Sequence, residues 1–220
     1  MGPHHRLPPP ASGCTHVTLT FFTHPMSRGR TVRWMLEEVG EPYDTALIDW
    51  SAKPAALTEA NPMGKVPTIV HDGAVVSEAA AICAYLAEAF PAAGLAPRAN
   101  ERAAYLRWLF FAAGPLEAAM VDKVLGVTVP EGKQGMVGYG SFDRAVDTLE
   151  HAVAAHDHIA GDRFTAADVF VGGMVGWFTQ FGLLEKRETF MRYLDRLHQR
   201  PAWQRAVAID DALLAEAPQR

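Results

Sequence analysis

The 220-residue sequence contains only two cysteines, Cys14 and Cys83, and neither belongs to a Cys-x-x-Cys motif or to a metal-ligand spacing. A disulfide scaffold is therefore not expected, and the chain fits a reducing cytoplasm. Long apolar runs are missing too: none reaches the ~18 residues that a transmembrane helix needs, so we expect no membrane partner. Positive charge is scarce, with a net charge of −5, and we expect no nucleic-acid partner.

Several common catalytic motifs are also absent. The chain has no Gly-x-Ser-x-Gly elbow, and Gly138-Tyr-Gly-Ser141 lacks both the preceding strand and the Gly-Lys-Ser/Thr ending of a phosphate loop. Three histidines, His151, His156 and His158, lie near the end of an expected helix, where histidines complement the helix dipole. No fourth ligand is spaced to complete a metal site, so we expect no metal.

The chain does have enough apolar material for a core. Hydrophobic residues make up 49% and charged residues 20% of the sequence, and its length allows one large domain or two modest ones. Residues 1–16 lack the apolar centre of a signal peptide, and we expect a disordered leader, either a remnant of cloning or the product of an early start codon. Pro91–Pro97 contains two prolines and a glycine, which predicts a linker between domains at residues 17–91 and 98–220.

The first half of the chain alternates strand and helix patterns. Val17–Phe22 is short and rich in β-branched and aromatic residues, which predicts a buried strand, and Tyr43–Ile48 predicts a second one. Between them, apolar residues recur at helical spacing and end at the glycine cap Gly40. Two strands joined through a helix predict a right-handed crossover with parallel strands.

The stretch Asn61–Leu86 is the most informative part of the sequence. Pro67–His71 and Ala74–Ser77 flank Asp72-Gly73, which is the strongest short signal for a β-hairpin. Apolar residues then recur at helical spacing over residues 79–90. Together the patterns predict the order β-α-β, a connector, and then β-β-α.

The second half contains helical patterns only. The capping-box spacing of Thr165 and Asp168, with Phe164 able to staple onto Val169, specifies the start of one helix, whose apolar body predicts burial at a domain centre. The expected fold class is α/β plus all-α. The helical patterns cover about Glu101–Leu125, Phe142–His156, Ala166–Phe181, Phe190–Leu197 and Trp203–Leu214, with a glycine-rich connection at Gly126–Gly140.

Four motifs, found in the correct order, resemble those of one known family. They are the first-helix segment Pro25-Met-Ser-Arg28 through Gly40, the turn Asn61-Pro-Met-Gly-Lys-Val-Pro67, the hairpin and helix start Asp72-Gly73 with Glu78, Ala81-Ile82 and Tyr85-Leu86, and the helix cap Phe164-Thr-x-x-Asp168. Over about residues 17–214 the chain resembles the glutathione S-transferase family, in particular its bacterial and fungal members.

The resemblance implies a thioredoxin-like N-terminal domain that binds glutathione, followed by an all-helical domain. It further implies a detoxification enzyme that takes glutathione as co-substrate, stabilises its thiolate and lets it attack a hydrophobic electrophile, and it implies a homodimer. The alternative is a non-catalytic protein that binds glutathione or a hydrophobic ligand with the same fold. Thiol redox work is disfavoured because no cysteine lies near residue 26 or 27.

Ser27 is the predicted catalytic residue. A free thiol has a pKa near ~8.5, so activation means favouring the thiolate, and a hydroxyl at the start of a helix can donate to the sulfur where the dipole favours an anion. The alternative is that Ser27 only caps the helix. Counted back from Gly40, the activating residue of several serine classes falls on Met26 instead. Arg28 either assists electrostatically or faces solvent.

The resemblance also assigns the residues that hold glutathione. Val66 would pair its backbone with the cysteinyl moiety like an added strand, with Pro67 in a cis peptide bond. Glu78 would accept from the γ-glutamyl ammonium. Ala79 replaces the family serine that holds the γ-glutamyl carboxylate, so the backbone N–H remains and one donor is lost. The expected neutralisers of the glycyl carboxylate are Lys53 and Lys65.

An apolar second substrate requires an apolar pocket. Tyr105 and Trp108 belong to a helical segment with too many aromatic residues for one narrow face, and with Met26 they are the predicted lining of the electrophile pocket. The alternative for the aromatic residues is an ordinary place in the core.

Overall fold

The computed structural model describes residues 18–216, so the predicted leader at residues 1–16 lies outside the described residues. The first half of the chain confirms the predicted βαβ-ββα order. Its elements are β1 (Leu19–Thr23), α1 (Gly29–Val39), β2 (Asp44–Leu47), α2 (Ala55–Ala60), β3 (Thr68–His71), β4 (Ala74–Ser77) and α3 (Ala79–Ala89).

Helix α2 was not predicted. The sequence patterns indicated only a connector between the second strand and Asn61. The helix spans six residues, too few for apolar residues to show a helical period. It begins after Pro54, whose φ of −65° suits the entry to a helix, and it buries Leu57. One buried leucine is thus the contact that holds this helix to the sheet.

The four strands form one mixed sheet in the order β2-β1-β3-β4. β1 runs parallel to β2, as the crossover predicts, and antiparallel to β3, which pairs antiparallel with β4. The β3–β4 hairpin turns at Asp72 and Gly73, whose φ values of 47° and 84° are the left-handed pair that a two-residue type I′ turn requires.

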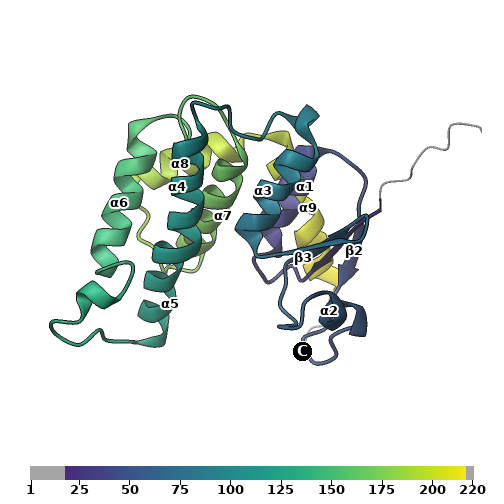
Figure 1. The fold of residues 1–220 in the computed structure, drawn as a ribbon, viewed down its shortest axis with the longest axis horizontal. Helices are drawn as coiled ribbons and strands as arrows, with labels where there is room; N and C mark the ends of the chain where they lie inside the picture. Colours follow the sequence, from purple (N-terminus) through teal and green to yellow (C-terminus); the bar gives the residue numbers. More distant parts are fainter. Residues whose placement is uncertain (1–17, 217–220) are drawn as a thin grey trace, which may run out of the picture.

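The two faces of the sheet are covered by different helices. Leu19 and Phe21 point into the main core with α1 and α3, while Phe22 points to the opposite face and packs with Ile48 and Leu57. This alternation is the period-two pattern of a strand that is buried on both faces. Figure 1 shows α1 and α3 on one side of the sheet and α2 on the other.

The second half forms an all-helical domain, and residues 78–216 add no further strand to the sheet. The predicted helix at Glu101–Leu125 is interrupted by a π-helical turn, Ala112–Leu116. Pro115 lies inside this turn, where it lacks the N–H that a regular helix would use. The helices are α4 (Arg102–Phe111), α5 (Glu117–Leu125), α6 (Phe142–Ala155), α7 (Ala166–Gln180), α8 (Glu188–His198) and α9 (Pro201–Glu216), with short 3₁₀ turns at Pro91–Ala93 and Gln134–Met136.

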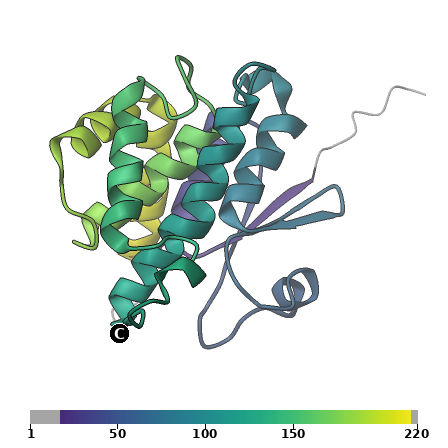
Figure 2. The same cartoon turned by 60° about the vertical axis from the view of Figure 1, so that its left-hand side comes forward.

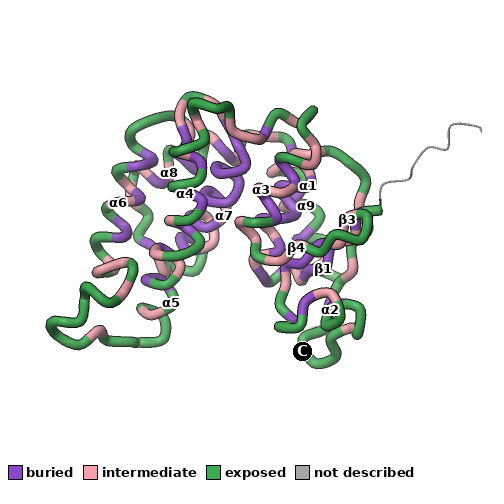
Figure 3. Tube along the Cα trace, in the orientation of Figure 1, coloured by how far each residue is buried: buried purple, intermediate pink, exposed green. Residues whose placement is uncertain are grey.

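Helix α7 is the centre of the molecule, as its apolar composition predicts. It packs against α1, α3, α4 and α8, and most of its residues are buried. Figure 3 shows buried stretches on the facing sides of these helices. Its capping box forms as expected, because the Thr165 N–H donates to Asp168 Oδ2 at 2.9 Å.

Helix α9 returns to the first domain and packs along α1. Figure 2 shows this C-terminal helix, in yellow, next to the purple α1. No helix between residues 18 and 216 is long and apolar enough to cross a membrane. In the same range, no cluster of three histidine, cysteine or acidic side chains could hold a metal ion.

Candidate functional site

Three chain segments meet at one end of the sheet. In the strand register, Phe22 of β1 lies opposite Thr68 of β3, and Thr68 lies opposite Ser77 of β4. The segments that continue beyond this row are the turn after β1, the loop before β3 and the start of α3. The sequence-predicted residues Ser27, Val66, Pro67, Glu78 and Ala79 lie on these three segments.

The turn after β1 is held together by Ser27. Its hydroxyl donates to the His24 carbonyl at 2.6 Å and accepts from the Gly29 N–H at 2.9 Å, and the residue is 9% exposed. These bonds close the turn into α1, which agrees with the alternative that Ser27 serves the helix start, while its role toward a thiol stays a prediction. Met26 is 47% exposed beside it, and its N–H donates to His24 Nδ1 at 3.0 Å.

His24 supports this turn as a neutral ring. Its imidazole lies against Trp50 with ring centroids 4.9 Å apart. Burial lowers the pKa of His24, and the Asp49 carboxylate opposes part of that decrease. The neutral ring can accept at Nδ1, and this acceptor orders the backbone at Met26.

Asn61 shapes the loop before β3. This asparagine belongs to the motif Asn61–Pro67, but the sequence alone indicated no role for it. The Asn61 amide group donates to the Lys65 carbonyl at 3.2 Å and to Thr68 Oγ1 at 3.1 Å, and its oxygen accepts from the Met63 N–H at 3.2 Å. Gly64 has a φ of 58°, in the left-handed region that favours glycine. A buried amide with three partners thus fixes the loop that carries Val66.

Lys53 lies beside this loop. A Cβ added to Gly64 would be 3.5 Å from the Lys53 Nζ atom, which places the ammonium close to the turn. Both Lys53 and Lys65 are exposed. Lys53 thus places a cation beside the loop, and Lys65 is an exposed cation within it.

Val66 has an unpaired backbone at the end of the sheet. The Val66–Pro67 peptide bond is cis, as the family resemblance implied. Among residues 18–216, neither the Val66 N–H nor its carbonyl makes a hydrogen bond. A backbone donor and acceptor on one residue can receive an extended peptide in the manner of an added strand.

Glu78 has an unusual backbone conformation directly before α3. Its φ of 68° lies in a region that non-glycine residues rarely adopt, and its side chain is exposed without capping the helix. Such conformations concentrate at binding sites, where the surrounding structure holds them in place. The carboxylate is left at the N-terminus of α3 together with the Ala79 N–H.

Comparisons with known proteins agree with this geometry. The family model described as "Glutathione S-transferase, N-terminal domain" matches residues 26–89, and the corresponding C-terminal domain model matches residues 100–208. The chain belongs to the glutathione S-transferase family. The protein is thus an enzyme of the glutathione S-transferase type.

Individual relatives are distant but extend over most of the chain. The chain is 25% identical over 201 residues to glutathione S-transferase hmp2 of Hypomyces subiculosus, covering 83% of this chain and 94% of that protein. A glutathione transferase of Methylococcus capsulatus superposes with a TM-score of 0.73 at 27% identity, covering 88% and 99% of the two chains. A sphingomonad glutathione S-transferase complexed with glutathione has a TM-score of 0.71 at 26% identity, covering 87% and 98%.

Arg28 of this glutathione S-transferase faces the helical domain. Its guanidinium forms an ion pair with Glu117 and lies 5.6 Å from the centroid of the Phe178 ring. Glu117 is the first residue of α5, directly after the π-helical turn. Nothing in the sequence indicates this partner, because residues so far apart in the chain show no spacing pattern.

Tyr105 and Trp108 of the transferase lie in the main hydrophobic core. The Tyr105 hydroxyl is buried with no hydrogen-bond partner in the described chain, and burial raises the pKa of this phenol. The Trp108 ring meets Phe111 edge-on at 5.5 Å. Both side chains thus contribute to the core, and their additional role in an electrophile pocket stays a prediction.

Proposed function

We propose that the protein binds glutathione at this end of the sheet and catalyses attack of its thiolate on a hydrophobic electrophile. The observation that supports the proposal best is the convergence of three features: the Ser27 turn, the unpaired backbone of Val66 and the exposed Glu78 carboxylate. They lie on the segments that adjoin β1, β3 and β4, in the order of these strands in the sheet. The complex of the sphingomonad relative with glutathione supports the same ligand.

In the proposed complex, each part of glutathione has a complementary group. Val66 pairs with the cysteinyl backbone, and Glu78 accepts from the γ-glutamyl ammonium in a charge-assisted hydrogen bond. The Ala79 N–H, at the start of α3, donates to the γ-glutamyl carboxylate. Lys53 and Lys65 neutralise the glycyl carboxylate. The Lys53 ammonium lies close to Gly64, within reach of the loop that carries Val66.

In the proposed reaction, the thiol loses its proton to solvent and the thiolate is held at the N-terminus of α1. Sulfur then forms a bond to an electrophilic carbon, and a leaving group such as halide departs with its bonding electrons. The Ser27 hydroxyl can turn about its Cβ–Oγ bond and redirect its proton from the His24 carbonyl to the sulfur, without moving the oxygen. The α1 dipole adds positive potential there, whereas the charge of Arg28 is largely compensated by its ion pair with Glu117.

Replacing Ser27 by alanine tests this role. We expect kcat/KM for conjugation of 1-chloro-2,4-dinitrobenzene to fall about tenfold or more, because one hydrogen bond to a charged sulfur contributes roughly 1.5–3 kcal/mol. The kinetic pKa of the bound thiol should rise in the pH–rate profile. Ser141→Ala is the matched control, since this serine accepts from the Arg144 N–H at the start of α6 and lies outside the proposed site.

A purely structural role for Ser27 would give a different pattern. The variant would then unfold at lower urea concentration but keep the wild-type thiol pKa in its pH–rate profile. That outcome would show that Ser27 only closes the turn before α1 and that another group activates the thiol.

Replacing Glu78 by glutamine tests the glutathione contact. We expect calorimetry to show about tenfold weaker binding of glutathione, because a charge-assisted hydrogen bond becomes a neutral one. Glu131→Gln, at an exposed position of the connection between α5 and α6, is the matched control and should bind as the wild type. Equal affinities for both variants would contradict the proposed orientation of the γ-glutamyl group.

The proposed setting is detoxification in the cytoplasm. Scarcity of cysteine supports a reducing compartment. Cys83 itself is buried, and burial raises the pKa of its thiol, so it is not a candidate nucleophile. Met26, Tyr105 and Trp108 are the proposed apolar lining on the electrophile side. Family membership supports a homodimer, which size-exclusion chromatography with light scattering would test.

A further inference from the structure

Thr23, the last residue of β1, has a buried hydroxyl without a hydrogen-bond partner. Its side chain shares the face of Leu19 and Phe21, because alternate residues of a strand point the same way, and this face meets α1. Thr23 is 0% exposed, and its Oγ1 atom makes no hydrogen bond within residues 18–216. Few buried polar groups of native proteins are left in this state, and each calls for an explanation.

Gly29, the first residue of α1, lies directly against this hydroxyl. A Cβ added to Gly29 would be 1.9 Å from Thr23 Oγ1 and 3.0 Å from Ser27 Oγ, so a larger residue would displace Thr23. The hydroxyl oxygens of Thr23 and Ser27 therefore adjoin the same glycine. They lie together where α1 begins, next to the position proposed for the sulfur of glutathione.

The two hydroxyls complement each other. A hydroxyl has one donor and two acceptor lone pairs. Ser27 Oγ donates to the His24 carbonyl and accepts from the Gly29 N–H, and no group among residues 18–216 donates to its second lone pair. Thr23 has a donor without an acceptor. A hydrogen bond from Thr23 Oγ1 to Ser27 Oγ would satisfy both groups.

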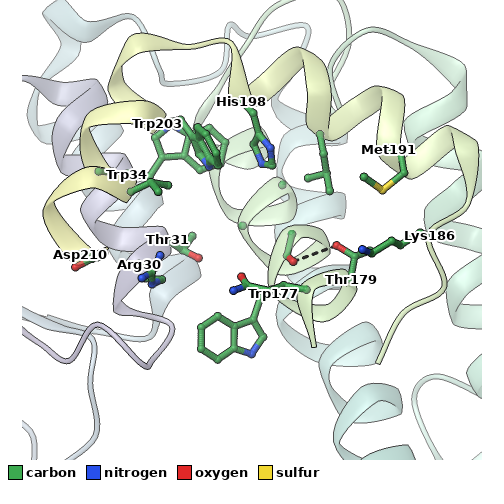
Figure 4. A pocket seen from close by; sticks show the side chains of 17 residues that line it. Arg30, Thr31, Trp34, Trp177, Thr179, Lys186, Met191, His198, Trp203 and Asp210 are labelled. Atoms are coloured by element: carbon green, nitrogen blue, oxygen red, sulfur yellow. Dashed lines mark hydrogen bonds between the residues drawn. The ribbon is translucent and has the colours of Figure 1, made fainter. Parts of the chain in front are cut away.

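Packing holds the first turn of α1 beside these hydroxyls. Arg30 Nε donates to the Pro25 carbonyl at 2.8 Å, which ties the helix to the turn before it. A Cβ added to Gly173 of α7 would lie 2.4 Å from Thr31 Oγ1, so α1 and α7 pack closely. Figure 4 shows Arg30 and Thr31 of α1 between α7 and α9, the helix that carries Asp210. Groups held in this way need little reorganisation during a reaction.

We propose that Thr23 is a positioning residue for Ser27, a role that rests on the proposed glutathione site and reaction. When the Ser27 proton turns from the His24 carbonyl to the sulfur, Thr23 Oγ1 donates to Ser27 Oγ. Donation to an anion makes the Ser27 oxygen a stronger acceptor, because linked hydrogen bonds polarise one another. The chain of bonds from Thr23 through Ser27 to the sulfur thus stabilises the thiolate more than Ser27 does alone.

Replacing Thr23 by valine removes the hydroxyl and keeps the branched shape. At a pH below the pKa of the bound thiol, we expect the thiolate fraction, followed by its ultraviolet absorbance, and kcat/KM for 1-chloro-2,4-dinitrobenzene to fall about threefold. Thr23→Ser keeps the donor and should retain the wild-type values. Thr179→Val is the matched control, because Thr179 is a buried threonine of α7 whose hydroxyl donates to the Val175 carbonyl. It should leave both quantities unchanged.

A double variant shows whether Thr23 acts through Ser27. In the Ser27→Ala background, Thr23→Val should have no further effect on kcat/KM, because the chain of hydrogen bonds is already broken. Equal losses in the two backgrounds would overturn the proposal. A wild-type thiol pKa in Thr23→Val, with the expected loss in Ser27→Ala, would overturn it while leaving the proposed function intact. Wild-type activity in Ser27→Ala would overturn the role of Ser27 and that of Thr23 with it.

Urea unfolding separates this role from a structural one. We expect Thr23→Val to unfold at the same or a higher urea concentration than the wild type, because a buried hydroxyl without a partner becomes a methyl group. A lower unfolding midpoint together with an unchanged thiol pKa would assign Thr23 to the fold alone and overturn the proposal.

Discussion

Replacing Asp210 by alanine is expected to lower the free energy of unfolding by about 3–5 kcal/mol. Arg33 Nε donates to Asp210 Oδ1 at 2.7 Å, and the two side chains are only 1% and 2% exposed. Burial raises the pKa of Asp210, with the Arg33 guanidinium opposing part of the rise, so this carboxylate is held in a poorly solvating environment. Its removal leaves a buried guanidinium without its counter-charge.

Other contacts of Arg33 cannot replace that counter-charge. Its Nη1 donates to the Tyr43 hydroxyl at 3.1 Å and to Thr45 Oγ1 at 3.2 Å, while Nη2 has no partner in the described chain. The guanidinium also lies 5.2 Å from the centroid of the Phe21 ring. These neutral contacts orient the side chain, but they do not neutralise it.

Urea unfolding followed by circular dichroism measures the loss, and the next residue in the chain supplies the control. Asp211 pairs with Arg30, but its side chain is 59% exposed, so Asp211→Ala should cost no more than about 1 kcal/mol. The double variant Arg33→Leu/Asp210→Leu should be more stable than Asp210→Ala, because no unpaired charge remains. Equal losses for Asp210→Ala and Asp211→Ala would contradict this account.

Replacing Asp168 by alanine is expected to cost about 3–4 kcal/mol of unfolding free energy. This fully buried carboxylate accepts from the Ile159 N–H at 2.8 Å, from the Thr165 N–H at 2.9 Å and from the Tyr193 hydroxyl at 3.1 Å. An alanine leaves all three donors buried and unsatisfied. It also removes the capping box of α7, against which four other helices pack.

The measurement pairs unfolding with hydrogen exchange. Backbone amides in the first turn of α7 should exchange faster in Asp168→Ala, since the cap no longer holds them. Asp143→Ala is the matched control, because Asp143 is also an acidic residue in the first turn of a helix but is exposed. We expect it to cost no more than about 1 kcal/mol. A similar loss in both variants would show that the buried network adds nothing beyond the dipole interaction.

Local signals account for the parts of the fold that could be predicted from the sequence. The Asp72-Gly73 hairpin and the Thr165–Asp168 capping box each depend on residues within four positions of one another, and both form as expected. The π-helical turn was missed although Pro115 marks it, because the apolar pattern continues across it. Periodicity reports which face is apolar and does not report a break in hydrogen bonding.

Long-range pairs account for most of what could not be predicted. Arg33 and Asp210 are 177 positions apart, and nothing in their local sequences indicates a partner. The same holds for Arg28 with Glu117. At the candidate site, the sequence motifs predicted that Val66 and Glu78 belong to one binding site. The hydrogen bonds of the Ser27 hydroxyl are seen only in the structure.

The packing of α9 on α1 affects the order in which the protein can mature during translation. Asp210 is added to the growing chain 177 residues after Arg33, which takes roughly 10–35 s at ordinary elongation rates. During the later part of that interval, once α3 has been synthesised, the βαβ-ββα segment is complete while the face of α1 is uncovered and the Arg33 guanidinium is unpaired. The N-terminal domain therefore cannot finish folding ahead of the C-terminal one, and nascent chains should need chaperone protection until α9 emerges.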